Sequence, residues 1–331
     1  MTQPIHVKAQ DTVVRTGNEV SKDVFEIYER GLAYLSTSQN ERGTWEAGEG
    51  NGPGTTGLAV LAFLASGEDP NFGPHQKVIR RGLRHIIQSQ SPVTGYMGPS
   101  MYHHGFASLA LAEAYGVVDD ETLFASGEEN GRSIEEALEL ATRASVTAQK
   151  RNRRGGWRYS PIASDADTSV SGAIMMALLA ARNAGIKVPD QSIERGLEYF
   201  SSMTMENGSV GYASTSDGGG DSLARSSIVN LVCSIARQKD LPAYERTKQY
   251  VLLNRDGDSI WPEYARYYQA QAMFQFDVDT WQSWNDRLVR KLKSNQKADG
   301  HFDGDLSDVN STSMSLLAIA VNFRFLPIYE R

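Results

Sequence analysis

A turn in which glycine is followed by an aromatic residue occurs six times along the chain, and it restricts the fold more than any other feature. The first copy runs from Gln39 through Gly43 to Trp45, and the last ends at Phe302. Counted from positions 45, 96, 157, 210, 261 and 302, the copies are 41 to 61 residues apart. Self-similarity at a fixed spacing indicates a repeat protein, in which each copy is one small structural unit.

The segments before the turns have the pattern of amphipathic helices. A phrase of Arg-Gly-Leu, any residue, an aromatic and an aliphatic residue begins at Arg30, Arg81 and Arg195, with His85 counted as aromatic. From Val24 to Leu35, apolar residues and one glycine recur at i, i+3, i+4, i+7 and i+11 on an otherwise charged segment. This spacing places them on one face of a helix whose other face meets water.

The segments after the turns consist almost entirely of apolar or small residues, which predicts helices buried on every side. They cover residues 57–67, 105–116, 168–185, 222–237, 263–276 and 311–323. Six buried helices inside six amphipathic ones predict an all-α fold, an α6/α6 toroid of six helix-turn-helix repeats. We expect residues 22–331 to form a single toroid domain and residues 1–21 to be an N-terminal extension.

Composition narrows the classes of partner. The net charge of -7 disfavours a nucleic-acid partner. No apolar run approaches the length of a membrane span, so only contact with a membrane surface stays open. The start, Met1 to Gln10, has no signal-peptide pattern, which predicts a cytoplasmic protein unless an export signal has been removed. The single cysteine, Cys233, excludes an internal disulfide. The oligomeric state stays open.

The repeated Gln-x3-Gly-x-Trp/Phe turn resembles the prenyltransferase and squalene-cyclase repeat of the α/α-toroid, or terpenoid-cyclase-like, superfamily. The phrases 101–105 (Met-Tyr-His-His-Gly), 167–170 (Asp-Thr-Ser-Val) and 267–275 (Tyr-Tyr-Gln-Ala-Gln-Ala-Met-Phe-Gln) are similar to those of small stand-alone bacterial members. The resemblance implies an α6/α6 barrel with a deep, often apolar central cavity. It does not by itself imply an activity.

The mechanisms known in this superfamily are only partly matched. Squalene-type cyclases carry an Asp-x-Asp-Asp-Thr acid motif, and the corresponding stretch ending at Thr168 keeps only Asp167 at a motif position. The zinc prenyltransferases need a thiolate-binding metal site, and Cys233 lies deep inside a predicted helix. Asp119-Asp120 does not continue into an Asp-Asp-x-x-Asp magnesium motif. We therefore expect no metal and no cofactor, and a divergent cyclase if the protein is catalytic.

Candidate site residues gather where the buried helices begin, because all their N-termini point to one rim of a toroid and favour anionic groups there. The predicted catalytic residues are Asp165, Asp167 and His104, although an aspartate before a helix is also the preferred N-cap. The predicted ligand-binding residues are His103, Tyr102, Tyr159, Asp221, Arg225, Tyr267, Tyr268, Gln271 and Asp305. For an open cavity, we expect the three catalytic candidates at its mouth and Tyr267, Tyr268 and Gln271 in its wall.

Three functions remain open from the sequence. The apolar, Met-rich interior favours a terpenoid-cyclase-like toroid that binds an isoprenoid or other apolar ligand in the cavity. Acids and aromatic residues at the same rim are also typical of a glycan-active α/α barrel, a hydrolase or lyase with paired carboxylates. The third class is a non-catalytic toroid that binds a protein.

Overall fold

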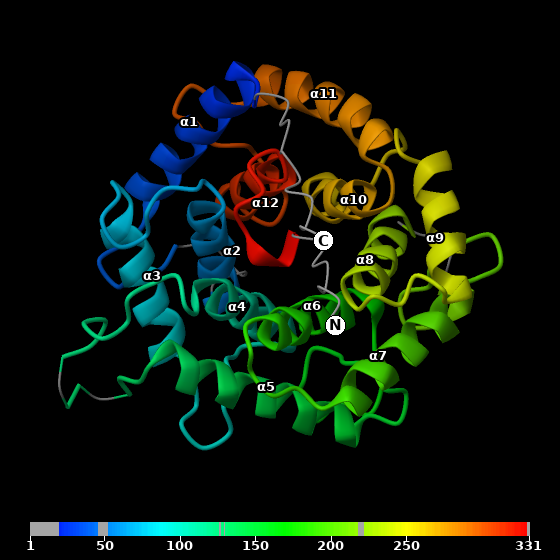
Figure 1. Cartoon of the computed structure of the whole chain (residues 1–331), viewed down its shortest axis with the longest axis horizontal. Helices are drawn as coiled ribbons and strands as arrows, with labels where there is room; N and C mark the ends of the chain where they lie inside the picture. Colours follow the sequence, from blue (N-terminus) through cyan, green and yellow to red (C-terminus); the bar gives the residue numbers. More distant parts are fainter. Residues whose placement is uncertain (1–19, 46–51, 126, 129, 218–221, 330–331) are drawn as a thin grey trace, which may run out of the picture.

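The computed structural model describes residues 20–45, 52–125, 127–128, 130–217 and 222–329. In these ranges twelve α-helices form two concentric rings (Figure 1), which confirms the predicted α6/α6 toroid. The outer helices are α1 (Lys22–Ser38), α3 (Gln76–Gln88), α5 (Ile134–Arg151), α7 (Asp190–Met203), α9 (Pro242–Leu253) and α11 (Val278–Asn295). The inner helices are α2 (Pro53–Leu64), α4 (Met101–Ala114), α6 (Thr168–Asn183), α8 (Ser222–Ile235), α10 (Pro262–Phe276) and α12 (Asp308–Ala320). Across the described ranges, no helix has both the length and the apolarity to span a lipid bilayer.

Three inner helices begin about one turn earlier than the apolar pattern predicts. Helix α2 begins at Pro53 and α4 begins after the N-cap Ser100, whose hydroxyl accepts the His103 N–H at 3.4 Å. Helix α12 begins after Ser307, whose hydroxyl accepts the Asn310 N–H. Because capping and proline rather than hydrophobicity decide where a helix starts, the first turns carry polar residues that the apolar pattern does not register.

The glycine in the repeated Arg-Gly-Leu phrase marks where an outer helix crosses close over an inner one. A β-carbon on Gly82 of α3 would lie 2.6 Å from the Val60 side chain of α2, and one on Gly31 of α1 would lie 2.7 Å from Leu316 of α12. Only the absence of a side chain permits such contact. Since α1 packs on α12, the first outer helix closes the ring against the last inner helix.

In four of the six repeats, the glutamine before the turn joins the repeat to its neighbour. The side-chain amide of Gln39 donates to the carbonyl of Gly43 in its own turn and to that of Val78 on the next outer helix, at 3.1 and 2.9 Å. Gln90 and Gln149 form the same pair of hydrogen bonds in the following units. Gln296 donates to Gly300 and, across the ring closure, to Ile27 of α1.

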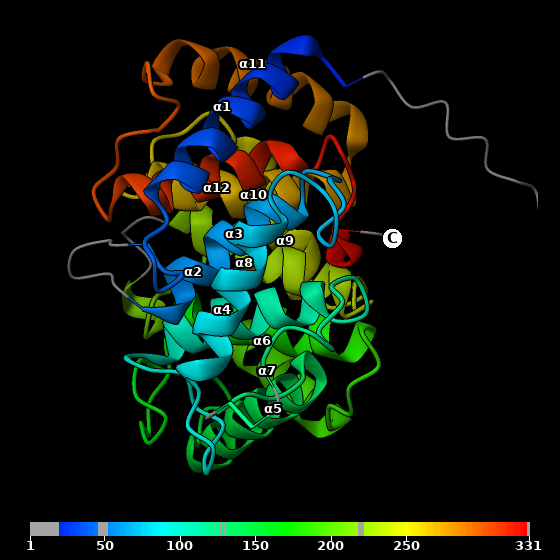
Figure 2. The same ribbon diagram turned by 90° about the vertical axis from the view of Figure 1, so that its left-hand side faces the viewer.

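The C-terminal segment packs against the end of the barrel that lies opposite the N-termini of the inner helices. The C-terminal end of the chain lies beside the barrel in Figure 2. The short 3₁₀ helix η3 (Pro327–Tyr329) contacts α6, and the side chains of Leu326 and Ile328 are buried. The backbone N–H of Ile328 donates to the carboxyl group of Glu113, near the C-terminal end of α4, at 3.4 Å. This end of the barrel is therefore packed, whereas the end formed by the N-termini of the inner helices holds a cavity.

Candidate functional site

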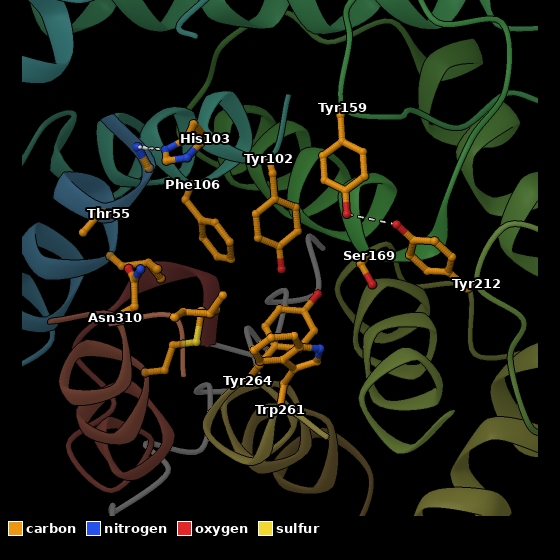
Figure 3. A pocket seen from close by; sticks show the side chains of 14 residues that line it. Thr55, Tyr102, His103, Phe106, Tyr159, Ser169, Tyr212, Trp261, Tyr264 and Asn310 are labelled. Carbon is orange, nitrogen blue, oxygen red and sulfur yellow. Dashed lines mark hydrogen bonds between the residues drawn. The ribbon is translucent and has the colours of Figure 1, made fainter. Parts of the chain in front are cut away.

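A cavity of about 390 Å³ lies inside the ring where the inner helices begin (Figure 3). The first two turns of α2, α4, α6, α10 and α12 and the connections before them form its wall. The lining consists of Gly54, Thr55, Leu58, Tyr102, His103, Phe106, Tyr159, Ser169, Tyr212, Trp261, Tyr264, Leu306, Asn310 and Met314. These described lining residues include six Phe, Tyr and Trp side chains and no carboxylate, so the surface offered to a ligand is aromatic and aliphatic with a few neutral polar groups.

Two tyrosines close one side of the cavity. The hydroxyl groups of Tyr159 and Tyr212 are hydrogen-bonded at 2.9 Å, as Figure 3 shows. Their backbones are held by the helices behind them, because the Met101 N–H donates to Tyr159 O and the Thr168 N–H donates to Tyr212 O. Burial and the bond to Tyr159 raise the pKa of Tyr212. Tyr212 is therefore neutral at physiological pH and offers a hydroxyl group rather than a charge.

A second group of aromatic side chains lies near the centre of the barrel. The ring of Tyr102 on α4 lies 5.2 Å from that of Phe106, edge to face, and 6.2 Å from that of Tyr264 on α10. Burial raises the pKa of Tyr102 and of Tyr264 well above the usual value, so both phenols stay protonated. Trp261, whose side chain is 42% exposed, lies at the N-cap of α10 and borders the cavity opening.

The two adjacent histidines of α4 point in different directions. His103 lines the cavity, and its Nδ1 atom accepts the Gly54 N–H at 3.2 Å. Burial lowers the pKa of His103, so the neutral ring carries its proton on Nε2. His104 is fully buried between α4 and α5: its Nδ1 accepts the Met97 N–H at 3.2 Å and its Nε2 lies 3.1 Å from Ala141 O. His104 therefore does not reach the cavity.

The two predicted acids of repeat three differ in environment, and neither belongs to the lining. Asp165 is exposed and forms an ion pair with Arg158 at 2.6 Å. Asp167 is the N-cap of α6: one carboxyl oxygen accepts the Val170 N–H at 2.8 Å, and the other is buried with no hydrogen-bond partner among the described residues. Burial raises the pKa of Asp167 to about 6. It lies directly behind the wall, two residues before the lining residue Ser169.

The remaining candidates are spread along the barrel. Tyr267, Tyr268 and Gln271 are buried on α10 outside the cavity lining, and the Gln271 amide donates to Tyr267 O at 2.9 Å. Arg225 is buried on α8, where its Nε donates to Val210 O at 2.7 Å. Asp305 is exposed on the connection before α12. Asp221 lies outside the described residues. Of the predicted ligand-binding residues, the structure therefore brings Tyr102, His103 and Tyr159 together at the cavity.

One group on the surface has atoms spaced for a metal ion. The ligand atoms of His301, Asp303 and Asp308 lie within 4.8 Å of one another. These side chains already pair among themselves and with neighbours: His301 Nδ1 lies 2.6 Å from Asp299, and Lys297 contacts Asp303. Although partial burial opposes the charge, the bonds to Asp299 and Asp303 raise the pKa of His301. The group is thus a network of ion pairs on the surface.

Sequence comparison assigns the chain to a family. Residues 25–256 match the model of DUF6288, described as a domain of unknown function. The chain belongs to the DUF6288 family. No curated protein matches it in sequence.

Solved structures similar to this DUF6288 chain include a terpene cyclase and a mannanase. The type II terpene cyclase MstE from Scytonema, in complex with geranylgeranyl dihydroxybenzoate, is 14% identical with a TM-score of 0.61, over 92% of this chain and 98% of that one. An α-1,6-mannanase of Salegentibacter, in complex with α-1,6-mannotriose, is 10% identical with a TM-score of 0.63, over 90% and 99%. Identities this low show a shared α/α-toroid fold only.

The DUF6288 chain also has lining residues that sequence reasoning missed. Thr55, Ser169 and Asn310 are polar residues in the first turn of an inner helix, and Leu306 lies just before α12. Each resembles an ordinary capping or connecting residue when read alone. What these residues share in the sequence is a position at the start of a buried helix, and all such positions lie at the same rim of the barrel.

Proposed function

We propose that this DUF6288 chain binds an isoprenoid or other apolar ligand in the cavity at the N-terminal rim, as a terpenoid-cyclase-like toroid. The observation that carries the proposal is the lining: aromatic and aliphatic side chains surround the space, and the described lining residues include no carboxylate. A cavity of about 390 Å³ is within the roughly 300–1,000 Å³ typical of small-molecule sites. Apolar surface in a preformed cavity favours a ligand of the same character.

If the bound ligand is also cyclised, Asp167 is the residue we assign as proton donor. Its carboxyl group is buried beside the cavity, and its pKa is raised to about 6, so about a tenth of it is protonated at pH 7. A type II cyclase needs such a neutral acid to protonate a double bond. The Asp-x-Asp-Asp motif that usually supplies it is broken in this sequence, which makes the chain a divergent member if it is catalytic.

A glycan is the second candidate, and one observation favours it. Tyr159 and Trp261 expose 49% and 42% of their surface beside the cavity opening, where flat rings can stack on sugars. The mannanase neighbour is known with bound mannotriose. However, retaining and inverting glycosidases use two carboxylates across the groove. Here Asp165 is paired with Arg158, so Asp167 has no second free carboxylate facing it among the described lining residues.

Binding of farnesol and of mannotriose, measured by isothermal calorimetry and by the shift in melting temperature, separates the two candidates. We expect farnesol to bind and to raise the melting temperature, because a ligand that binds only the folded state stabilises it. Ser169→Trp fills the cavity and should abolish this binding. The matched control Ser201→Trp, on the exposed side of α7, should not. Binding of mannotriose without farnesol would overturn the proposal.

A separate incubation tests catalysis. Farnesol or geranylgeraniol is incubated with wild-type protein and with Asp167→Asn, and the extracts are examined for a cyclised isomer of unchanged mass. A product formed by the wild type and lost in the variant would support Asp167 as the acid. An equal yield from both proteins would remove it from that role.

A further inference from the structure

The side-chain oxygen of a buried asparagine in the cavity wall has no hydrogen-bond partner among the described residues. Asn310 lies in the first turn of α12, where its backbone N–H is bound by the hydroxyl group of Ser307 at 3.1 Å. Its side chain lines the cavity and the residue is 7% exposed. The amide oxygen Oδ1 is buried and has no hydrogen-bond partner among the described residues. Buried polar groups are nearly always paired, so a ligand that turns this side chain toward the cavity can supply the missing partner.

The position of the amide in the cavity restricts what that ligand can be. Figure 3 shows Asn310 on the same side of the cavity as Thr55 and His103, with the rings of Phe106 and Tyr102 beyond them. Leu58 and Met314 complete the wall on this side. The polar group of the ligand that bonds to the amide therefore belongs to a molecule whose remaining surface contacts mainly carbon atoms of the wall.

The charge in the wall restricts the polar group of the ligand. An amide presents an N–H donor and a carbonyl acceptor from the same side chain and carries no charge. The other polar lining groups on this side are the neutral His103 ring and the Thr55 hydroxyl. Since none of the described lining residues carries a formal positive charge at neutral pH, the wall suits a neutral oxygen group better than a carboxylate or a phosphate.

We propose that Asn310 is a specificity-determining residue, whose amide bonds to a neutral hydroxyl or carbonyl group on an otherwise apolar ligand. The site then selects an oxygenated isoprenoid-like molecule over a hydrocarbon of the same size. This inference rests on the proposed binding of an apolar ligand in the cavity and adds the identity of its polar end.

The test compares two probes of matched carbon skeleton, the alcohol farnesol and the hydrocarbon farnesene, on wild-type protein and on Asn310→Leu. The measured quantity is the ratio of the two dissociation constants, because differences in the hydration of the free probes cancel between the two proteins. We expect the preference for farnesol to fall about tenfold in Asn310→Leu, which corresponds to about 1.4 kcal/mol. Farnesene should bind the variant at least as well as it binds the wild type.

The control variant is Met314→Leu, one turn further along α12 and in the same wall. It exchanges one apolar side chain for another, so it should change the affinity for both probes alike and leave their ratio within about twofold. Thermal unfolding gives an independent readout. Because the Asn310 amide oxygen has no hydrogen-bond partner among the described residues, Asn310→Leu should keep or raise the melting temperature.

Each outcome decides the matter. A ratio that is the same in wild type and Asn310→Leu, while both probes bind, overturns this inference and leaves the proposed function standing. A clearly lower melting temperature of Asn310→Leu would show that the amide serves the fold instead. If neither probe binds wild-type protein, the proposed function fails, and the inference fails with it.

Discussion

The imidazole of His104 on α4 and the hydroxyl group of Ser145 on α5 are hydrogen-bonded, with 3.1 Å between Nε2 and Oγ. The bond joins an inner helix to the outer helix that follows it. Because Nδ1 accepts the Met97 N–H, the proton of the neutral ring is on Nε2 and is donated toward α5. One of the two histidines that the sequence singles out is thus part of the packing between the two layers.

Replacement of His104 by alanine should therefore affect stability first. We expect His104→Ala to lower the free energy of unfolding by roughly 2 to 4 kcal/mol, because it leaves a cavity and an unpaired Met97 N–H. Urea unfolding followed by circular dichroism measures the change. The neighbouring His103→Ala, at the partly open cavity wall, is the matched control and should cost less. Equal losses from the two variants would contradict the assignment.

Glu113 should make the stability of the folded protein depend on pH. Burial raises its pKa to about 8, above the ordinary value of 4.5. Between these two values the folded state keeps a proton that the unfolded state has lost, so the contribution of Glu113 to stability falls as pH rises, by up to about 1.4 kcal/mol per pH unit.

Unfolding by urea at several pH values between 5 and 8 tests this expectation on wild type and Glu113→Gln. The glutamine cannot lose a proton, so the variant should lack this part of the slope and should gain most, relative to wild type, at pH 8. His104 contributes with the opposite sign, because burial lowers its pKa from 6.5 to about 4. Its contribution to the free energy of unfolding therefore increases as pH rises from about 4 to 6.5. Parallel curves for the two proteins would show that Glu113 is not buried as a neutral acid.

Asp167 can be tested as a helix cap and as a titrating group. Asp167→Asn keeps an oxygen for the Val170 N–H, so its stability at pH 7 should stay within about 1 kcal/mol of wild type, whereas Asp167→Ala should lose roughly 0.5 to 2 kcal/mol with the cap. Because the pKa of Asp167 is raised to about 6, its contribution in the wild type falls as pH rises from about 4 to 6. A loss of several kcal/mol from Asp167→Asn would instead assign it an essential role in holding the barrel together.

Two glycines with nearly the same φ allow the cost of a left-handed backbone to be separated from the cost of a steric clash. Gly95, in a repeat turn, has φ of 75°, and a β-carbon there would lie 2.1 Å from Leu140 O. Gly116, at the end of an inner helix, has φ of 76° with nothing within 4 Å. We expect Gly116→Ala to cost about 1 kcal/mol for the left-handed backbone alone. Gly95→Ala should cost clearly more, because the turn must also move away from α5.

Comparison of the melting temperatures of these two variants checks that expectation. A larger loss in Gly95→Ala would show that the repeated glycine is needed for close contact between neighbouring units. Equal losses would mean that backbone conformation alone explains why glycine occupies the turn.

The repeat architecture could be predicted from the sequence because it is encoded by local patterns. The helical spacing from Val24 to Leu35 and the turn from Gln39 to Trp45 each lie within a single unit, and both were interpreted correctly. The physical role of the glutamine could not be seen in this way. Its second bond, from Gln39 to Val78 or from Gln296 to Ile27, reaches a different unit.

The sequence predicts candidate residues at the rim where the cavity lies, and only some of these residues line the cavity. The direction of the inner helices fixes the rim, since helices that all begin at one end place their first turns together. The rotation of each helix about its own axis decides which residues of that turn face inward, and packing against both neighbouring inner helices and the outer layer sets this rotation. Sequence alone therefore proposed both His103 and His104, about 100° apart on one turn. Only the tertiary structure turned His103 to the cavity and His104 to α5, because the Gly54 N–H meets the first ring and the Ala141 carbonyl meets the second.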